Sequence, residues 1–312
     1  MPRKAFVYSS IAAAVLLVLG LTAFAQDAWD IHKAAYKGNM MCVMCHKSLP
    51  VSKDIVPAYE KTGHSKAMMK ASVEGAIVGD FSAGAPFTKD KVAWVLGKGR
   101  NQQAYLDANF QVLNGKWDVK AKKWMPSPEA DGSTQCIGCH TTGFDPATKK
   151  FVAEGVGCEM CHGPGSDHMP SPPKNIINPK KIDAKKAAMI CGSCHSAGKD
   201  PSGKFACPVG YRPGDDLTKS FVDAKPTAPG NNQQYSELMQ STMAGVSCTV
   251  CHDPHNVVNA KSQLRKPINE LCLGCHAAIK DIKTHAPQAA ADATCASCHM
   301  PEGQHTFKKP AK

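Results

Sequence analysis

The sequence predicts a mainly α-helical fold with extensive loops and one small β element, and three observations lead to this prediction. Aromatic residues make up only 6% of the 312 residues, which is too few for a core of packed rings. The 25 Gly and 22 Pro indicate many turns. Fourteen of the 15 Cys lie in seven copies of one short motif. Such a chain must build its core around an apolar group other than aromatic side chains.

The repeated motif is Cys-x-x-Cys-His. Two thiols at this spacing reach the two vinyl groups of one porphyrin and form thioethers, and the adjacent His binds the iron from the proximal side. Zinc ribbons and redox dithiols also use Cys-x-x-Cys, but neither requires a His after every second Cys. The sequence therefore predicts seven covalently bound haem c groups, which we number in chain order. The predicted thioether residues are Cys42, Cys45, Cys136, Cys139, Cys158, Cys161, Cys191, Cys194, Cys248, Cys251, Cys272, Cys275, Cys295 and Cys298. The predicted proximal ligands are His46, His140, His162, His195, His252, His276 and His299.

The first 25 residues are predicted to be a secretory signal peptide. Arg3 and Lys4 form a positive start, Ile11 to Ala23 is an apolar run, and Ala23-Phe24-Ala25 is a small-x-small cleavage site. An uncleaved anchor is the alternative, but the run is short for a span, and no later segment is apolar for long enough. We expect an exported protein without a transmembrane span in its mature form. The periplasm is the expected location, with the extracellular space or outer surface as alternatives.

The predicted mature chain of 287 residues has 41 residues for each haem, which forces the haems into contact. We therefore expect a multihaem cytochrome c built around a packed haem array. The formal charge of +11 includes Arg3 and Lys4, so the mature chain carries +9. Ionised haem propionates offset most of this charge, so its basic character does not indicate nucleic-acid binding.

The motifs are spread unevenly, and we predict two regions after the signal peptide at 1–25. Residues 26–205 form a four-haem region, and residues 206–312 form a C-terminal three-haem region. The small β element is expected in the first gap, with strands Phe110–Leu113 and Lys116–Val119 around an Asn114-Gly115 turn. In the second gap we expect a helix from about Gln233 to Ala244, stopped by Gly245.

Six His remain after the seven motif His, and each is a candidate distal iron ligand. They are His32, His64, His168, His255, His285 and His305. A solvent-exposed loop His is the alternative for each, and His32 lies close to a chain end. Because six His cannot fill seven sites, at least one haem must take a Met, a Lys, a His from another chain, or remain open. Cys207 lies outside every motif and is expected to be a buried or free thiol, with an intermolecular disulfide as the alternative.

Several segments resemble the cytochrome c-554-type multihaem family. The run from Gly157 to His168 carries the resemblance most specifically, and the segments 36–38, 62–67 and 95–124 are similar as well. The run Cys251-His252-Asp253-Pro254-His255 resembles the doubled-motif cytochromes. The resemblance implies electron-transfer cytochromes with mostly bis-His haems in stacked and perpendicular pairs. By motif, it implies that His64, His168 and His255 are distal ligands, and some members keep one haem five-coordinate.

Met243 departs from the pattern of similar proteins. They often carry Ser-x-His ahead of a Gly-Val-x-Cys motif, and this chain has Met243 where the His would stand. Tyr235, Met239 and Met243 recur every four residues and would share one face of the predicted helix. We therefore predict Met243 as the seventh distal ligand, with ordinary core packing as the alternative.

The expected function is electron transfer in anaerobic respiration. The chain would act as a conduit between redox proteins such as a quinol-oxidising complex, a terminal reductase or outer-membrane cytochromes. One alternative is a haem enzyme that reduces or oxidises a small nitrogen or sulfur compound at an open haem. Another is a subunit of a filament or an outer-membrane complex, which would make the protein an oligomer. The residues favour a carrier over an enzyme without deciding between them.

Intact mass tests the haem count. The mature protein should weigh as much as the chain from Gln26 plus seven haems, because each motif binds one haem through two thioethers. Cys207→Ser should leave the count at seven. A fully matured protein with six haems or fewer would contradict the assignment of the motifs.

Overall fold

The computed structural model describes residues 29–228, 230, 232–256 and 262–308, so the predicted signal peptide lies outside the described residues. The helices are α2 (Asn39–His46), α3 (Ile55–Tyr59), α4 (Gly132–Gln135), α5 (Ile137–His140), α6 (Cys158–His162), α7 (Ala184–Gly192), α8 (Gln234–Met239), α9 (Cys248–Cys251), α10 (Ile268–Leu273), α11 (Ile282–His285) and α12 (Cys295–His299), with short 3₁₀ turns η2 (Lys89–Lys91), η3 (Leu217–Lys219) and η4 (Pro301–Gly303). The strands are β1 (Met68–Lys70), β2 (Trp94–Leu96), β3 (Gln102–Leu106), β4 (Val112–Asp118), β5 (Lys123–Pro126), β6 (Thr141–Thr142), β7 (Ala153–Glu154), β8 (Gly198–Lys199) and β9 (Val222–Asp223).

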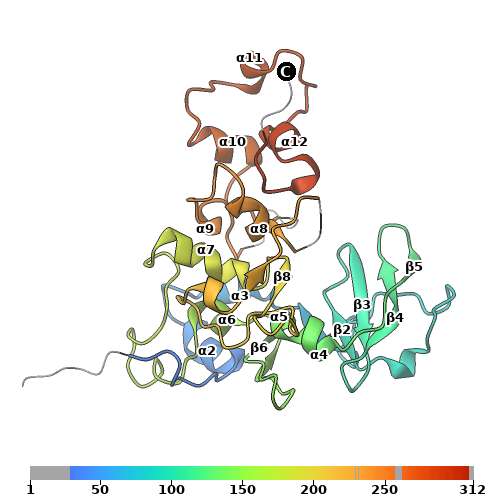
Figure 1. Cartoon of the computed structure of the whole chain (residues 1–312). Helices are drawn as coiled ribbons and strands as arrows, with labels where there is room; N and C mark the ends of the chain where they lie inside the picture. Colours follow the sequence, from blue (N-terminus) through green and yellow to red (C-terminus); the bar gives the residue numbers. More distant parts are fainter. Residues whose placement is uncertain (1–28, 229, 231, 257–261, 309–312) are drawn as a thin grey trace, which may run out of the picture.

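The molecule has three recognisable parts (Figure 1). Helices α2, α5, α6 and α7 form a central body, and the β1–β5 sheet projects from one side of it. Helices α10, α11 and α12 form the end that lies opposite α2. Among the described residues, no helix is both long enough and apolar enough to span a bilayer.

The prediction of a mainly α fold is wrong. The structure is 25% helix and 13% strand, and it contains a five-stranded antiparallel sheet in the order β1-β2-β3-β4-β5. The helices are short because a haem motif needs little more than one helical turn to place two Cys and a His. The sheet forms because the first gap in the motifs holds β-branched and aromatic residues, which favour strands.

The sheet is larger than predicted and turns at different places. The segment expected to turn at Asn114-Gly115 is one continuous strand, β4, which pairs with β3 on one side and β5 on the other. The expected turn is therefore wrong. A Cβ on Gly115 would clash with the Pro86 ring, so this glycine allows the loop before η2 to pack closely against the strand.

The two faces of the sheet pack against different partners, because side chains alternate along each strand. On one face, Val95, Tyr105 and Trp117 lie in an aromatic cluster with Phe81, Phe87 and Trp124. On the other face, Met68, Leu96, Leu106 and Val112 pack against Ile137, which lies between Cys136 and Cys139. The sheet thus braces the second haem motif.

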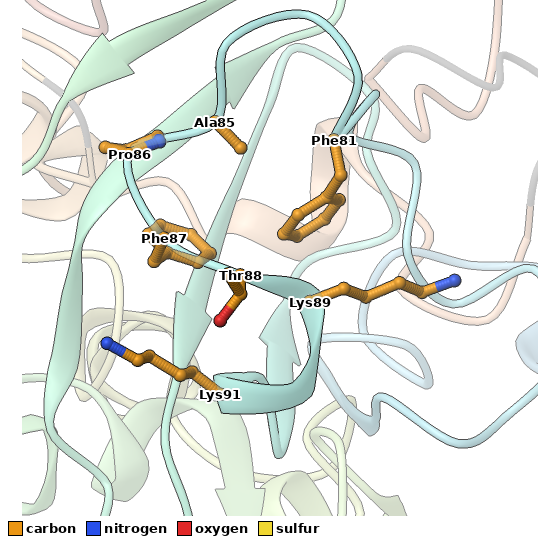
Figure 2. Close-up of a pocket in the computed structure, with 7 residues that line it drawn as sticks. All are labelled: Phe81, Ala85, Pro86, Phe87, Thr88, Lys89 and Lys91. Atoms are coloured by element: carbon orange, nitrogen blue, oxygen red, sulfur yellow. The ribbon is translucent and has the colours of Figure 1, made fainter.

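A hollow of about 470 Å³ opens beside the aromatic cluster (Figure 2). The rings of Phe81 and Phe87 form its apolar floor, and the side chains of Lys89 and Lys91 extend to either side. None of its lining residues belongs to a haem motif.

A third cluster joins α7 to the second gap in the motifs. Ala188 and Met189 of α7 pack against Tyr211, Phe221 and Tyr235. The helix predicted from Gln233 to Ala244 is too long, because α8 ends at Met239. The Ser241 hydroxyl donates to the Leu238 carbonyl and accepts from the Met243 amide. These two bonds satisfy backbone groups in a turn, so the helix does not continue. Met243 therefore lies outside the helical face that was used to predict it as a ligand.

Truncation of Leu106 tests the role of the sheet core. Leu106 is 0% exposed, so Leu106→Ala should lower the free energy of unfolding by about 2–5 kcal/mol through lost burial and a residual cavity. Val73→Ala, at a residue that is 48% exposed, should change it by less than about 0.5 kcal/mol. Chemical denaturation followed by far-UV circular dichroism measures both. Equal effects of the two substitutions would contradict a packed core at Leu106.

Candidate haem sites

Each haem motif lies on or next to a short helix. Motifs 1, 2, 3, 5 and 7 lie largely within α2, α5, α6, α9 and α12, whereas motifs 4 and 6 begin in the last turns of α7 and α10. The helical turn points both Cys and the His to one side, where a porphyrin can bind. No disulfide joins any of the fifteen Cys, all of which are described.

Six of the seven motif His direct Nδ1 toward an acceptor elsewhere in the chain. The pairs are His46 with Ser52 Oγ (3.1 Å), His140 with the Ala67 carbonyl (2.8 Å), His162 with the Ile177 carbonyl (2.7 Å), His195 with Gln234 Oε1 (3.2 Å), His252 with the Ser262 carbonyl (2.7 Å) and His299 with the Lys308 carbonyl (3.0 Å). Such a bond fixes the tautomer and leaves Nε2 free to bind metal. These acceptors are hard to predict from the sequence, because four of them are backbone carbonyls.

Five of the motif His face a second His ring. The pairs, with their centroid separations, are His46 and His168 (6.2 Å), His195 and His64 (6.1 Å), His162 and His255 (5.9 Å), His252 and His305 (6.1 Å), and His299 and His285 (6.2 Å). Two metal–nitrogen bonds of roughly 2 Å, with roughly 1 Å from each nitrogen to its ring centre, give about 6 Å. The spacing therefore fits one iron between each pair of rings.

Burial keeps several of these imidazoles neutral. Desolvation lowers the pKa of His64 to about 4, and it lowers the pKa of His140, His162 and His195 as well. A neutral imidazole has a free lone pair, so these rings are in the metal-binding form at neutral pH.

Three His are not in a facing pair. His140 and His276 are motif His, and His32 is a distal candidate. His32 Nε2 lies 3.2 Å from Asp215 Oδ1 on the surface, with the His32 side chain 53% exposed. Met243 is half-buried in the turn between α8 and α9, and its assignment as a ligand stays a prediction.

The motif cysteines lie next to one another in a definite order. The thiols interact in pairs across motifs, Cys42 with Cys158, Cys139 with Cys194, Cys191 with Cys248, and Cys272 with Cys295. Cys161 and Cys194 interact electrostatically, as do Cys251 and Cys275. These neighbours place the motifs in the order 1-3-4-5-6-7, with motif 2 beside motif 4.

Two asparagines join neighbouring motifs in the same way. Asn39 precedes Cys42 by three residues and accepts from the amide of Cys158, at 3.0 Å. Asn269 precedes Cys272 by three residues and accepts from the amide of Cys295, at 2.9 Å. Each asparagine thus caps the helix of the neighbouring motif. Motifs 6 and 7 consequently meet as motifs 1 and 3 do.

Glu159 fastens the chain around motif 1 to motif 3. Its carboxylate is 1% exposed and accepts hydrogen bonds from the amides of Lys37, Gly38 and Gly165 at 2.7–3.1 Å. The charge is therefore buried among donors, as burial requires. Its role was not predicted, although an acidic residue between the two Cys of motif 3 is a signal in the sequence.

Cys207 lies outside this array of motifs but touches it. Its side chain is 9% exposed, and burial raises the pKa of its thiol to about 12. A Cβ on Gly138 would clash with its sulfur, so Cys207 packs directly on the backbone of motif 2.

The residues present fit covalently bound haem. Five facing imidazole pairs supply axial donors of the correct type and spacing. Tyr211 Oη and Arg212 Nε are buried without a hydrogen-bond partner among the described residues. Donors of this kind bind carboxylates, which haem carries as propionates. Bound haem would supply one-electron redox chemistry, while the protein holds and orients it.

The fold and these sites define the chain as a multihaem c-type cytochrome with covalently bound haem c. Residues 101–163 match the model of the family described as cytochrome c554 and c-prime, and residues 241–281 match the doubled CXXCH motif. The predicted resemblance to the cytochrome c-554-type family, with a doubled-motif C-terminal region, is confirmed.

Three curated relatives are each 26% identical to this chain over the matched part. They are the C-type polyheme cytochrome OmcC of Geobacter sulfurreducens, the multiheme cytochrome MtrA of Shewanella baltica and cytochrome c-554 of Nitrosomonas europaea. The matches cover 55%, 55% and 59% of this chain, in that order. They span 21% of OmcC and 65% of each of the other two.

The fold is shared with a solved structure, the outer cell wall cytochrome OcwA. The TM-score is 0.72 at 23% identity, and the match covers 88% of this chain and 79% of OcwA. At this identity the likeness establishes the fold alone.

Removal of the Glu159 carboxylate should destabilise the protein. Glu159→Ala leaves buried amides without an acceptor, at a cost of about 1–3 kcal/mol for each unsatisfied group. Glu159→Gln keeps one oxygen acceptor and should cost less. Denaturant unfolding measures both, with Glu74→Ala at an exposed residue as the control. If Glu159→Ala unfolds at the same denaturant concentration as the control, the carboxylate does not hold the two motifs together.

Proposed function

We propose that this protein is an exported heptahaem cytochrome that conducts electrons between respiratory partners. The observation that carries the proposal is the unbroken series of neighbouring motif cysteines from Cys42 to Cys295. Haems attached to these cysteines would lie within contact of one another, and electron transfer between redox centres is fast only at such short range.

The packing of the helices supports the same order. Helix α2 packs on α6, α6 on α7, α7 on α9, and α10 on α12. The step from motif 5 to motif 6 is supported by the interaction of Cys251 with Cys275. We therefore propose a route along motifs 1, 3, 4, 5, 6 and 7 from the α2 end to the α10–α12 end (Figure 1). Motif 2 is a side branch from motif 4, under the sheet.

We assign the five facing His pairs as the axial ligands of haems 1, 3, 4, 5 and 7. Three of the distal His follow a later motif and reach back to an earlier one. His168, after motif 3, faces His46 of motif 1; His255, after motif 5, faces His162 of motif 3; and His305, after motif 7, faces His252 of motif 5. Iron held by two imidazoles has no free position for a substrate, which suits electron transfer.

One observation at motif 2, the side branch, favours the alternative, which is a haem enzyme for small nitrogen or sulfur compounds. His140 has no facing His, although its Nδ1 is firmly held by the Ala67 carbonyl at 2.8 Å. A haem that lies off the main route could exchange electrons with it while binding a small molecule. Met243 stays the predicted distal ligand for one of the two haems without a facing His.

Exchange of one distal His tests the assignment of ligands. His168→Ala should convert one low-spin haem to high-spin, because His46 would lose its partner across the iron. His32→Ala is the matched control and should leave the spectrum of a dilute sample unchanged. Electron paramagnetic resonance of the oxidised holoprotein counts both species. No new high-spin signal in His168→Ala would contradict the pairing.

Protein-film voltammetry separates the conduit from the enzyme. The holoprotein adsorbed on an electrode should give reversible redox signals, and addition of nitrite, hydroxylamine or sulfite should produce no catalytic current. A sustained catalytic current with one of these compounds would favour the enzyme.

A further inference from the structure

The haem site at His276 differs from the other six in how its imidazole is held. The other six motif His are half-buried, whereas His276 is exposed. The other six have an acceptor for Nδ1, and His276 has none within the described part of the chain. His276 is also one of the two motif His without a facing His. All three observations show that the imidazole of His276 has few neighbours among the described residues.

The comparison with His140, the other motif His without a partner ring, shows the contrast. His140 is half-buried, its Nδ1 is bound to the Ala67 carbonyl, and the adjacent Ile137 packs under the sheet. His276 lies beyond the end of α10, and its neighbours Cys275, Ala277 and Ala278 are exposed. The imidazole of His140 is thus enclosed by the protein, and the imidazole of His276 is exposed.

Motif 6 lies between motifs 5 and 7, so a missing sixth ligand there would affect a haem on the proposed electron route. Cys275 lies near Cys251 of motif 5, and Cys272 lies against Cys295 of motif 7. The haem of motif 6 is therefore on the main route. An acceptor on Nδ1 orients an imidazole and increases its basicity. Because no described residue accepts from its Nδ1, His276 would be a weaker proximal donor to a bound haem. A second imidazole would give this haem the two imidazole ligands, and the low-spin iron, that we assign to haems 5 and 7 beside it.

We propose that the haem of motif 6 takes its sixth ligand from outside the fold, and that this ligand is a neutral imidazole. The inference rests on the proposed seven-haem array. The imidazole could belong to a small molecule or to a second copy of this chain. In the second case the donor is His32, since all thirteen His lie in the described residues and His32 alone is neither a motif His nor opposite one.

Geometry favours a donor from a second copy over one from the same chain. His32 precedes α2, and α2 lies at the end of the molecule opposite α10–α12 (Figure 1). A contact that joins the α2 end of one copy to the α10 end of the next would be head-to-tail. It would extend the route of haems from one molecule to the next.

The test is a titration of the oxidised holoprotein with imidazole, followed by electron paramagnetic resonance. Intact mass is measured first, so that a failure of the seven-haem proposal is recognised separately. In a dilute sample with seven haems, imidazole should convert one high-spin haem to low-spin. An imidazole tethered to a polymer too large to enter the protein should do the same, because the proposed ligand comes from outside the fold.

Two matched variants locate the responding haem. Cys272→Ala with Cys275→Ala removes haem 6 and should abolish the response, whereas Cys295→Ala with Cys298→Ala removes haem 7 and should preserve it. A response that persists without haem 6, or no response in the native protein, overturns the proposal. If neither variant matures, the tethered imidazole decides, and its failure where free imidazole succeeds overturns the assignment to His276.

Protein concentration distinguishes the two sources of the ligand. If a second copy supplies it, concentration alone should convert the haem and increase the apparent mass in sedimentation. His32→Ala should prevent both changes, while free imidazole still converts the haem. If a small molecule supplies it, concentration and His32→Ala should have no effect.

Discussion

The arrangement of the chain depends on the hydrogen bond between the Nδ1 of a motif His and an acceptor outside the motif, 6 to 73 residues away. A Cys-x-x-Cys-His turn can form alone, but by itself it does not fix the direction in which Nε2 points. Ile177 fixes this direction for His162, Gln234 for His195 and Ser262 for His252. Because two of these acceptors come from loops that follow their motif, the loops are structural parts of the haem sites and not simple connections.

These loops explain why a chain with so few aromatic residues can fold. The clusters of apolar side chains are small, and their aromatic rings lie around the sheet and beside α7. Elsewhere, polar contacts join distant segments. Glu159 binds the amides before α2, and Asn39 and Asn269 each cap a helix of another motif. Each of these groups is satisfied by backbone amides, so the motifs are held in register by directional bonds rather than by bulk hydrophobic packing.

Much of the candidate site was predictable from the sequence, because covalent attachment requires fixed residues at fixed spacing. His168 and His255 could be selected as distal candidates for a different reason, which is that each closely follows a motif. Which motif they face was not predictable, because it depends on how distant segments meet. The sheet was underestimated since Asn114-Gly115 resembles a turn, and only the closeness of Pro86 shows that the glycine serves packing instead. The helix at Gln233 was overestimated because Ser241 competes for the backbone groups that would extend it.

The pairing of early motifs with later His sets the order in which the protein can be assembled. The partner of His46 lies 122 residues downstream, at His168, and the partner of His252 lies at His305, close to the carboxyl end. An exported chain that emerges amino end first would present motifs 1, 3 and 5 before the His that faces each of them, whereas His64 and His285 precede the motif His that they face. The sites that we propose at motifs 1, 3 and 5 would therefore close only after a later segment of the chain has emerged.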